Sequence, residues 1–234
     1  MDDLIGVSVV GQPLVYGAGF IALLLVVFTG SWAGSIVTVA HEGGHMFFSV
    51  LTFWGFRHFD LEDGGGGGTD HGRAIGWGPG DFVLRLAGYL TPPLLGLAGA
   101  AVLVAGNAWG ILASAAFLFG VAFLFAHNGL ANLVTLIAAA GIVLVLWRGS
   151  TFLQVTVAIV VIWWLLIGGV RSAVIMATDG GSDAAVMGRR YLLPAVIWKL
   201  FWITVALVCL YAGGRLLFTG TAWPAGVWPF DVRA

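Results

Sequence analysis

Long apolar runs, separated by short polar connections, dominate the chain. No Asp, Glu, Lys or Arg occurs between Leu86 and Trp147. A helix needs about 20 apolar residues to cross a bilayer, so this stretch alone has room for three spans. Six apolar segments can be marked along the whole chain: 14–54, 82–106, 109–126, 130–147, 151–176 and 191–218.

This pattern predicts an all-α fold, a polytopic transmembrane helical bundle of about six spans. We expect residues 1–234 to form a single integral membrane domain. The first apolar segment is about twice the usual length of a span. Thr29, Gly30 and Ser31 lie near its middle and could break it into two helices, which leaves seven spans as the alternative.

One hydrophilic stretch of any size interrupts the apolar pattern, at residues 57–81. It contains five acids, two arginines, two histidines and nine glycines, which include the run from Gly64 to Gly68. It is too short for a folded domain, and its composition predicts a Gly-rich, flexible polar loop with a short strand at residues 73–77.

Arginine placement predicts the orientation in the membrane. Most arginines fall in two connections that the predicted spans place on one side, and positively charged connections face the cytoplasm. The connection after the first segment and the one before the last span are therefore expected in the cytoplasm, and the C-terminus outside. The arginines of these connections are Arg57, Arg73, Arg85, Arg171, Arg189 and Arg190.

Bulk composition excludes several classes of protein. The chain is 60% hydrophobic and 9% charged, with a mean hydropathy of +1.01. Soluble domains carry about 25% charged residues, so the lipid bilayer is the expected environment. The net charge of -1 offers no basic surface for nucleic acid.

The candidate chemistry lies inside the first apolar segment, at His41, Glu42 and His45. On a helix the two histidines are one turn apart and share a face, so both imidazoles can reach one metal ion. Glu42 lies beside them and can accept a proton from water. This is the His-Glu-x-x-His arrangement of zinc peptidases, and it predicts a Zn²⁺ cofactor with Glu42 as the catalytic base.

The structural alternative is that these three side chains form polar contacts between helices or line a proton path. An acid at the centre of a membrane helix costs about 3 kcal/mol, so it needs a partner, and a divalent cation suits all three groups. Gly43 and Gly44 lie between the histidines. We expect them to let another backbone, from a neighbouring helix or a substrate, approach the metal.

Two histidines leave a catalytic zinc ion one protein ligand short. Asp179 and Asp183 are the only pair of acids near a span boundary on the predicted cytoplasmic side. Ser182 can cap a following helix and thereby fix Asp183 in its first turn, whereas Asp179 lies in a Gly-rich turn. We therefore predict Asp183 as the third metal ligand, with Asp179 as the alternative.

The chain resembles the site-2 proteases, a family of intramembrane zinc metallopeptidases, through the motif His41-Glu42-Gly43-Gly44-His45 and a late aspartate. More narrowly it is similar to a compact, mostly bacterial branch without a PDZ domain. The stretches 87–93, 147–150 and 182–184 also have counterparts in that branch. The wider family has a third-ligand motif Asn-x-x-Pro-x-x-x-Leu-Asp-Gly, of which this chain keeps only Asp179-Gly180.

The resemblance implies cleavage of a transmembrane segment of another membrane protein, often one that holds a transcription regulator at the membrane. It also implies a bacterial plasma membrane. A catalytically inactive pseudo-peptidase that acts as a membrane scaffold or chaperone is the alternative, which a missing third ligand would favour. A metal or proton transporter would need acids in several spans, and residues 86–147 carry none.

Other polar residues have weaker signals. Asn128 could donate to an oxyanion, but a turn between two spans is the role we predict for it. A second metal site in the loop is conceivable, although loop histidines beside acids are more often solvated. The residues that such a site would use are His58, Asp60, Asp70 and His71.

Overall fold

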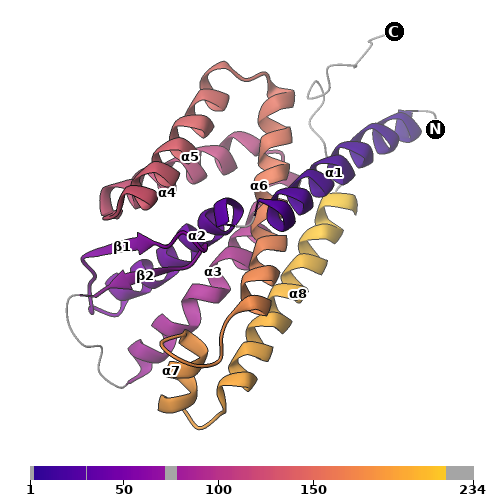
Figure 1. Ribbon diagram of the computed structural model, residues 1–234. Coiled ribbons are helices and arrows are strands. Elements are labelled where there is room, and N and C mark those ends of the chain that lie inside the picture. The colour runs from indigo at the N-terminus through magenta and orange to yellow at the C-terminus, as the bar shows by residue number, and fades with distance from the viewer. Residues whose placement is uncertain (1–2, 30, 72–77, 220–234) are drawn as a thin grey trace.

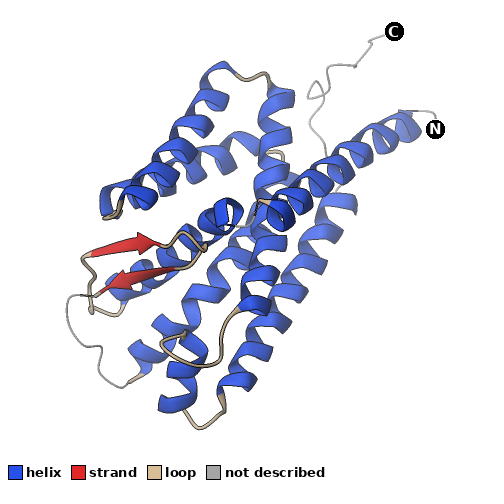
Figure 2. Ribbon diagram, viewed as in Figure 1, coloured by secondary structure: helices blue, strands red, loops and turns tan. Residues whose placement is uncertain are grey.

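The computed structural model describes residues 3–29, 31–71 and 78–219, which form eight helices and one two-stranded sheet (Figures 1 and 2). The helices are α1 (Asp3–Phe28), α2 (Ser31–Leu51), α3 (Pro79–Val104), α4 (Ala108–Phe125), α5 (Gly129–Arg148), α6 (Thr151–Ile175), α7 (Asp183–Arg190) and α8 (Ala195–Thr219). The strands are β1 (His58–Leu61) and β2 (Gly67–Asp70).

Five of the helices in the described part of the chain are long and apolar enough to cross a membrane: α3, α4, α5, α6 and α8. Their exposed surfaces carry large apolar side chains, as expected for helices that face lipid. The predicted fold class, an all-α polytopic membrane bundle, is confirmed.

The first apolar segment consists of two helices rather than one. Helix α1 ends at Phe28, and α2 begins at Ser31. Thr29 closes the end of α1, where both its backbone N–H and its hydroxyl donate to the carbonyl of Leu25. The break considered for residues 29–31 is therefore present, and it allows α2 to take its own direction in the bundle (Figure 1).

Helix α6 lies at the centre of the bundle and packs against α1, α3 and α8. Small residues permit these close contacts. A Cβ atom at Gly169 of α6 would lie 2.9 Å from Cδ of Pro93, one of two prolines inside α3. One at Gly96 of α3 would lie 2.8 Å from Cγ of Leu166. Helices in membranes associate through such small residues because lipid provides no hydrophobic driving force between them.

Helix α2 approaches α3 equally closely at Gly44. A Cβ atom there would collide with the side chain of Thr91 and would lie 3.0 Å from the carbonyl oxygen of Ala87. The expected close approach of a neighbouring backbone is therefore found at Gly44. At Gly43, in contrast, no described residue lies within 4 Å of the corresponding position.

The polar stretch between α2 and α3 contains an antiparallel β-hairpin, which the sequence did not predict. Phe59 and Leu61 of β1 are fully or almost fully buried against α2, α4 and α5, while His58 and Asp60 lie on the opposite face. The last residues of the stretch, from Pro79, already belong to α3. The strand predicted at 73–77 lies outside the described residues.

The outer edge of β1 is bonded to the connection between α4 and α5. Ala126 forms a parallel bridge with Phe59, and the N–H of His127 donates to the carbonyl of Phe59 over 3.0 Å. Asn128 continues the contact, since its side-chain amide donates to the carbonyl of Leu61 over 2.6 Å. The hairpin is thus anchored along one edge, through β1.

Candidate metal centre

The two predicted histidine ligands face each other on α2. Nε2 of His41 and Nε2 of His45 lie 3.0 Å apart, as the one-turn spacing requires. Nδ1 of His45 lies 2.9 Å from the carbonyl oxygen of Leu84 in α3. A proton on Nδ1 satisfies this hydrogen bond and leaves the lone pair of Nε2 directed at His41.

Asp183 completes a cluster of three potential ligand atoms. Its Oδ2 lies 3.2 Å from Nε2 of His45 and 3.4 Å from Nε2 of His41, although 138 residues separate it from His45. Asp183 occupies the first turn of α7, and the hydroxyl of Ser182 caps this helix by accepting from the N–H of Ala185. Asp179 is exposed and lies outside the cluster.

The geometry of this cluster fits a tetrahedral zinc ion. Ligand atoms about 2.0–2.1 Å from zinc lie about 3.4 Å apart in a tetrahedral set, and the three distances here are close to that value. Gly88 of α3 leaves the space open: a Cβ atom there would lie 2.5 Å from Nε2 of His45 and 2.7 Å from Nε2 of His41. His41, His45 and Asp183 are therefore the residues that would hold the metal.

The carboxylate of Asp183 is held in its charged form. Burial alone would raise its pKa, but the charge and hydrogen bonds of the imidazoles of His45 and His41 outweigh burial and keep the pKa well below its usual range. An ionised carboxylate is the form that binds a cation.

A buried network positions α7 relative to α3. Asp81 is fully buried, and its Oδ1 accepts from Nε of Arg85 over 2.9 Å and pairs with Nη1 of Arg190 at 2.8 Å. Its Oδ2 accepts from the hydroxyl of Tyr191 over 2.8 Å. Arg85 also reaches Asp183, with Nη1 3.7 Å from Oδ1. The N-terminal turn of α3 therefore fixes both ends of α7.

The same network affects the titration of Tyr191. Burial and the hydrogen bond to the carboxylate of Asp81 raise the pKa of Tyr191 to about 12. The phenol therefore remains a hydrogen-bond donor through the physiological pH range.

Glu42 is buried at the same place and is held by the hairpin. The hydroxyl of Thr69 in β2 donates to Oε2 of Glu42 over 2.6 Å. This hydrogen bond orients the carboxylate. Glu42 lines a cavity of about 340 Å³ together with the three potential ligands and the backbone of Gly67 and Gly68. That volume is large enough for a short peptide segment.

Two further side chains shape this cavity. The ring of Tyr89 packs edge-on against the imidazole of His41, with ring centroids 4.4 Å apart. His71 also lines the cavity, and its Nδ1 lies 3.0 Å from the hydroxyl of Ser49 and 3.3 Å from the carbonyl oxygen of Gly55. Burial lowers the pKa of His71.

The stretch at 87–93 now has a physical explanation. Gly88 makes room for the imidazoles, Tyr89 supports His41, and Thr91 fills the gap left by Gly44. Pro93, the last residue of this stretch, faces α6 at Gly169.

Sequence reasoning missed Asp81, Arg85 and Thr69. The four-residue spacing of Asp81 and Arg85 at the start of a span was a usable signal, because it places an acid and a base on one helix face. Thr69 had no comparable signal, since its contact with Glu42 depends on the path of the hairpin. Asn128 lies in the predicted turn, where its Oδ1 caps α5 by accepting from the N–H of Ala131 over 2.9 Å.

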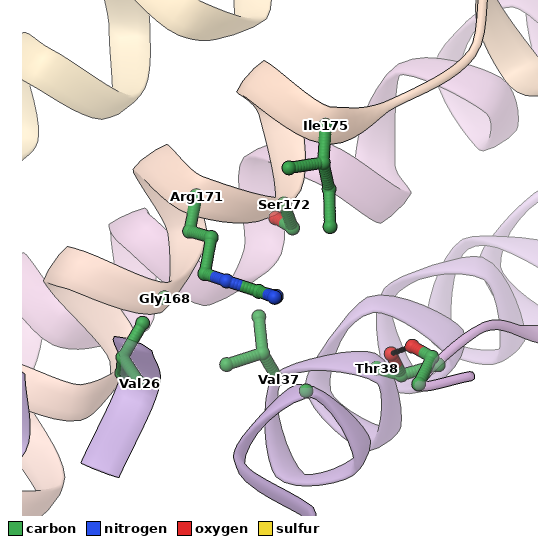
Figure 3. Close-up of a pocket in the computed structure, with 9 residues that line it drawn as sticks. Val26, Val37, Thr38, Gly168, Arg171, Ser172 and Ile175 are labelled. Atoms are coloured by element: carbon green, nitrogen blue, oxygen red, sulfur yellow. Dashed lines mark hydrogen bonds between the residues drawn. The ribbon is translucent and has the colours of Figure 1, made fainter. Parts of the chain in front are cut away.

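A much smaller pocket lies between α2 and α6 (Figure 3). Its volume is about 30 Å³, which is space for about one water molecule. Arg171 of α6 extends into it beside Val37, and Thr38 donates to the carbonyl of Gly65 at its edge over 2.6 Å. None of the three potential metal ligands lines this pocket, so the candidate centre is the larger cavity.

The chain matches one protein-family model over most of its length. The model of the peptidase M50B-like family matches residues 14–213, so the chain belongs to that family. It is a membrane peptidase of the site-2 protease type, and the resemblance identified from the sequence is confirmed. No curated protein and no solved structure matches the chain.

Proposed function

We propose that the protein is an intramembrane zinc metalloendopeptidase that hydrolyses peptide bonds within or next to transmembrane segments of other membrane proteins. The observation that carries this proposal is the position of Asp183. Its Oδ2 lies within 3.4 Å of both imidazole Nε2 atoms, from an element far away in sequence. Packing between helices alone gives no reason for three potential ligand atoms to converge around a glycine.

The residues of the chain divide the chemistry between them. His41, His45 and Asp183 would hold the metal. A zinc ion bound there would supply a Lewis acid that polarises the peptide carbonyl and makes water more acidic. Glu42 accepts the proton of the attacking water at its carboxylate and returns it to the leaving amine. Thr69 keeps that carboxylate oriented through its hydrogen bond to Oε2.

Strand β2 offers a place for the substrate backbone. Gly67 and Thr69 stand opposite Leu61 and Phe59 in the hairpin. The carbonyls of Phe59 and Leu61 accept hydrogen bonds from residues 127 and 128, so their backbone groups point away from β2. In an antiparallel pair, residues directly opposite each other both point inward or both point outward. The backbone N–H and C=O groups of Gly67 and Thr69 therefore point away from β1. Gly67 and Thr69 also line the cavity. A substrate helix must unwind before its carbonyls are accessible, and the unwound segment can pair with this edge.

We infer the membrane orientation from charge. The hairpin and the first residue of α7 line the same cavity, and the connection between α4 and α5 is bonded to the hairpin. Most arginines lie in or near the connections that carry the hairpin and α7, so we propose that the site faces the cytoplasm of a bacterial plasma membrane. Regulated release of a membrane-held transcription regulator is the corresponding role.

A pseudo-peptidase that works as a scaffold or chaperone is the alternative. A missing third ligand would have favoured it, whereas Asp183 lies beside both histidines. A purified preparation without zinc and without cleavage activity would favour the scaffold.

The decisive experiment compares the purified full-length wild type with Glu42→Gln and Glu62→Gln in a cleavage assay. The substrate is a tagged single-span membrane protein in detergent or liposomes. The two glutamates are the only ones in the chain, and Glu62 is exposed at the hairpin turn. We expect zinc in all three proteins and loss of cleavage only in Glu42→Gln. Unchanged cleavage by Glu42→Gln would refute the proposed mechanism.

A second pair of variants tests the metal ligand. Asp183→Asn is expected to lose zinc and activity, and Asp179→Asn to keep both, because Asp179 is exposed outside the cluster. Zinc retained by Asp183→Asn but lost by Asp179→Asn would reverse the assignment.

A further inference from the structure

A second cluster of metal-binding side chains lies on the outer face of the hairpin. In β1 the side chains alternate, so Phe59 and Leu61 point into the core, while His58 and Asp60 share the outward face. Nε2 of His58 lies 3.7 Å from Oδ2 of Asp60. Asp70 stands opposite His58 in the register, with Oδ2 3.9 Å from the same nitrogen.

The connection between α4 and α5 adds a second imidazole to this face. His127 is fixed by the backbone hydrogen bond to Phe59, and its Nδ1 lies 3.1 Å from Oδ1 of Asp60. Its ring stacks on that of His58, with centroids 4.1 Å apart and planes inclined by 28°. One ligand atom from each of His58, Asp60 and His127 can be chosen so that all lie within 4.8 Å of one another.

We propose that His58, Asp60 and His127 bind a divalent transition-metal ion. Two imidazoles and a carboxylate suit zinc and its neighbours in the first transition row rather than magnesium or calcium. Nδ1 of His127 lies 3.1 Å from Oδ1 of Asp60, and Nε2 of His58 lies 3.7 Å from Oδ2, so the two imidazoles contact the two oxygens of one carboxylate.

This site differs from the candidate catalytic centre in exposure. The side chains of His58, Asp60 and His127 are 30%, 39% and 64% exposed, whereas those of the first cluster are 8–15% exposed. The metal at the outer site would therefore exchange readily with the solution, and the bound amount would follow the free concentration. The assignment rests on this second cluster alone and is independent of the proposed peptidase activity.

A metal ion here would add a further link between two segments that are already hydrogen-bonded along β1. His58 and Asp60 belong to the hairpin, and His127 belongs to the connection between α4 and α5. Because Thr69 of the same hairpin holds Glu42, metal binding at the outer face would restrict the motion of the strand that orients the catalytic base.

The test is zinc stoichiometry on the purified full-length protein, after chelation and titration with zinc. The variant is His58→Gln/His127→Gln, and Asp63→Asn is the control, since Asp63 is an exposed acid of the hairpin turn outside the cluster. We expect the wild type and Asp63→Asn to bind one equivalent more than the double variant. This difference is expected whether or not the first centre retains its own zinc. The test can therefore refute the outer metal site without bearing on the candidate catalytic centre.

Hydrogen exchange of residues 58–70 supplies a second readout that needs no activity. Zinc should slow exchange of these amides at least threefold in the wild type and in Asp63→Asn, with no effect in the double variant. Equal stoichiometry in the wild type and the double variant would overturn the proposal, and so would a dissociation constant above about 0.1 mM for the extra equivalent. A double variant that keeps wild-type helix content by circular dichroism but loses the equivalent supports it.

Discussion

Thr69 on the hairpin holds Glu42 on α2 through a hydrogen bond of 2.6 Å between Oγ1 and Oε2. Helix α2 carries this carboxylate, and strand β2, which follows the Gly-rich turn, fixes its orientation. The orientation of Glu42, the proposed base, therefore depends on the hairpin, although His41, Glu42 and His45 all lie within one helix.

Thr69→Ala should lower the cleavage rate about tenfold or more while leaving the zinc content unchanged. A hydrogen bond to a charged group contributes about 1.5–3 kcal/mol, and about 1.4 kcal/mol corresponds to a factor of ten. Thr69→Ser keeps the hydroxyl and should retain most of the activity. Steady-state cleavage assays on both variants test this. An equal loss of activity in Thr69→Ala and Thr69→Ser would show that the methyl group, not the hydroxyl, matters.

Thr69→Pro probes the proposed pairing of substrate with β2. Proline removes the backbone N–H and also the hydroxyl, whereas Thr69→Ala removes the hydroxyl alone. We expect KM to be higher for the proline variant than for the alanine variant, measured with the same tagged substrate. If the two variants have the same KM, the substrate does not bind the backbone at this position.

Gly88→Ala should abolish zinc binding at the first centre. The added methyl group would lie 2.5–2.7 Å from the imidazole nitrogens of His45 and His41, too close for the existing geometry. Gly141→Ala in α5 is the matched control, because no described residue lies within 4 Å of its Cβ position. Metal analysis after purification distinguishes the two, and a zinc-loaded, active Gly88→Ala protein would contradict the geometry.

Asp81→Asn should destabilise the fold and weaken zinc binding together. The fully buried carboxylate of Asp81 accepts from Tyr191 and pairs with Arg85 and Arg190, and its loss leaves two guanidinium groups without that charge. Breaking a buried pair costs about 3 kcal/mol, which lowers Tm by several degrees. Thermal unfolding in detergent measures this, with Asp63→Asn as the exposed control. An unchanged Tm would show that the network does not hold α7.

Tyr191→Phe should make the stability of the folded protein fall less at alkaline pH than it does in the wild type. The folded pKa of Tyr191 is raised to about 12 from an ordinary value near 10. The stabilisation associated with this shift is therefore fully present below about pH 10 and is lost as pH rises toward 12. Tm measured from pH 8 to 12 should fall less steeply between pH 10 and 12 in Tyr191→Phe than in the wild type. Parallel curves would contradict this.

Local periodicity made part of the site predictable. His41, Glu42 and His45 follow from helical spacing alone, and Asp183 followed from the number of zinc ligands together with the cap that Ser182 provides. The long apolar segments predicted the membrane bundle for the same reason, because length and hydropathy are local properties.

The hairpin and the network around Asp81 could not be predicted in the same way. β2 consists of Gly67, Gly68, Thr69 and Asp70, which have low strand propensity apart from threonine, so the strand depends on its pairing with β1. The contacts of Asp81 with Arg190 and Tyr191 join residues about a hundred positions apart, and they depend on how α3 and α7 pack.

The anchoring of β1 to residues 126–128 has a consequence for growth of the sheet. An unpaired strand edge invites neighbouring molecules to add strand after strand, which leads to aggregation. Here the α4–α5 connection pairs with the outer edge of β1, so a further strand could add to the hairpin only beside β2. The edge of β2 lines the cavity through Gly67, Gly68 and Thr69, so the strand addition that remains open to the hairpin is the one that the proposed substrate pairing would use.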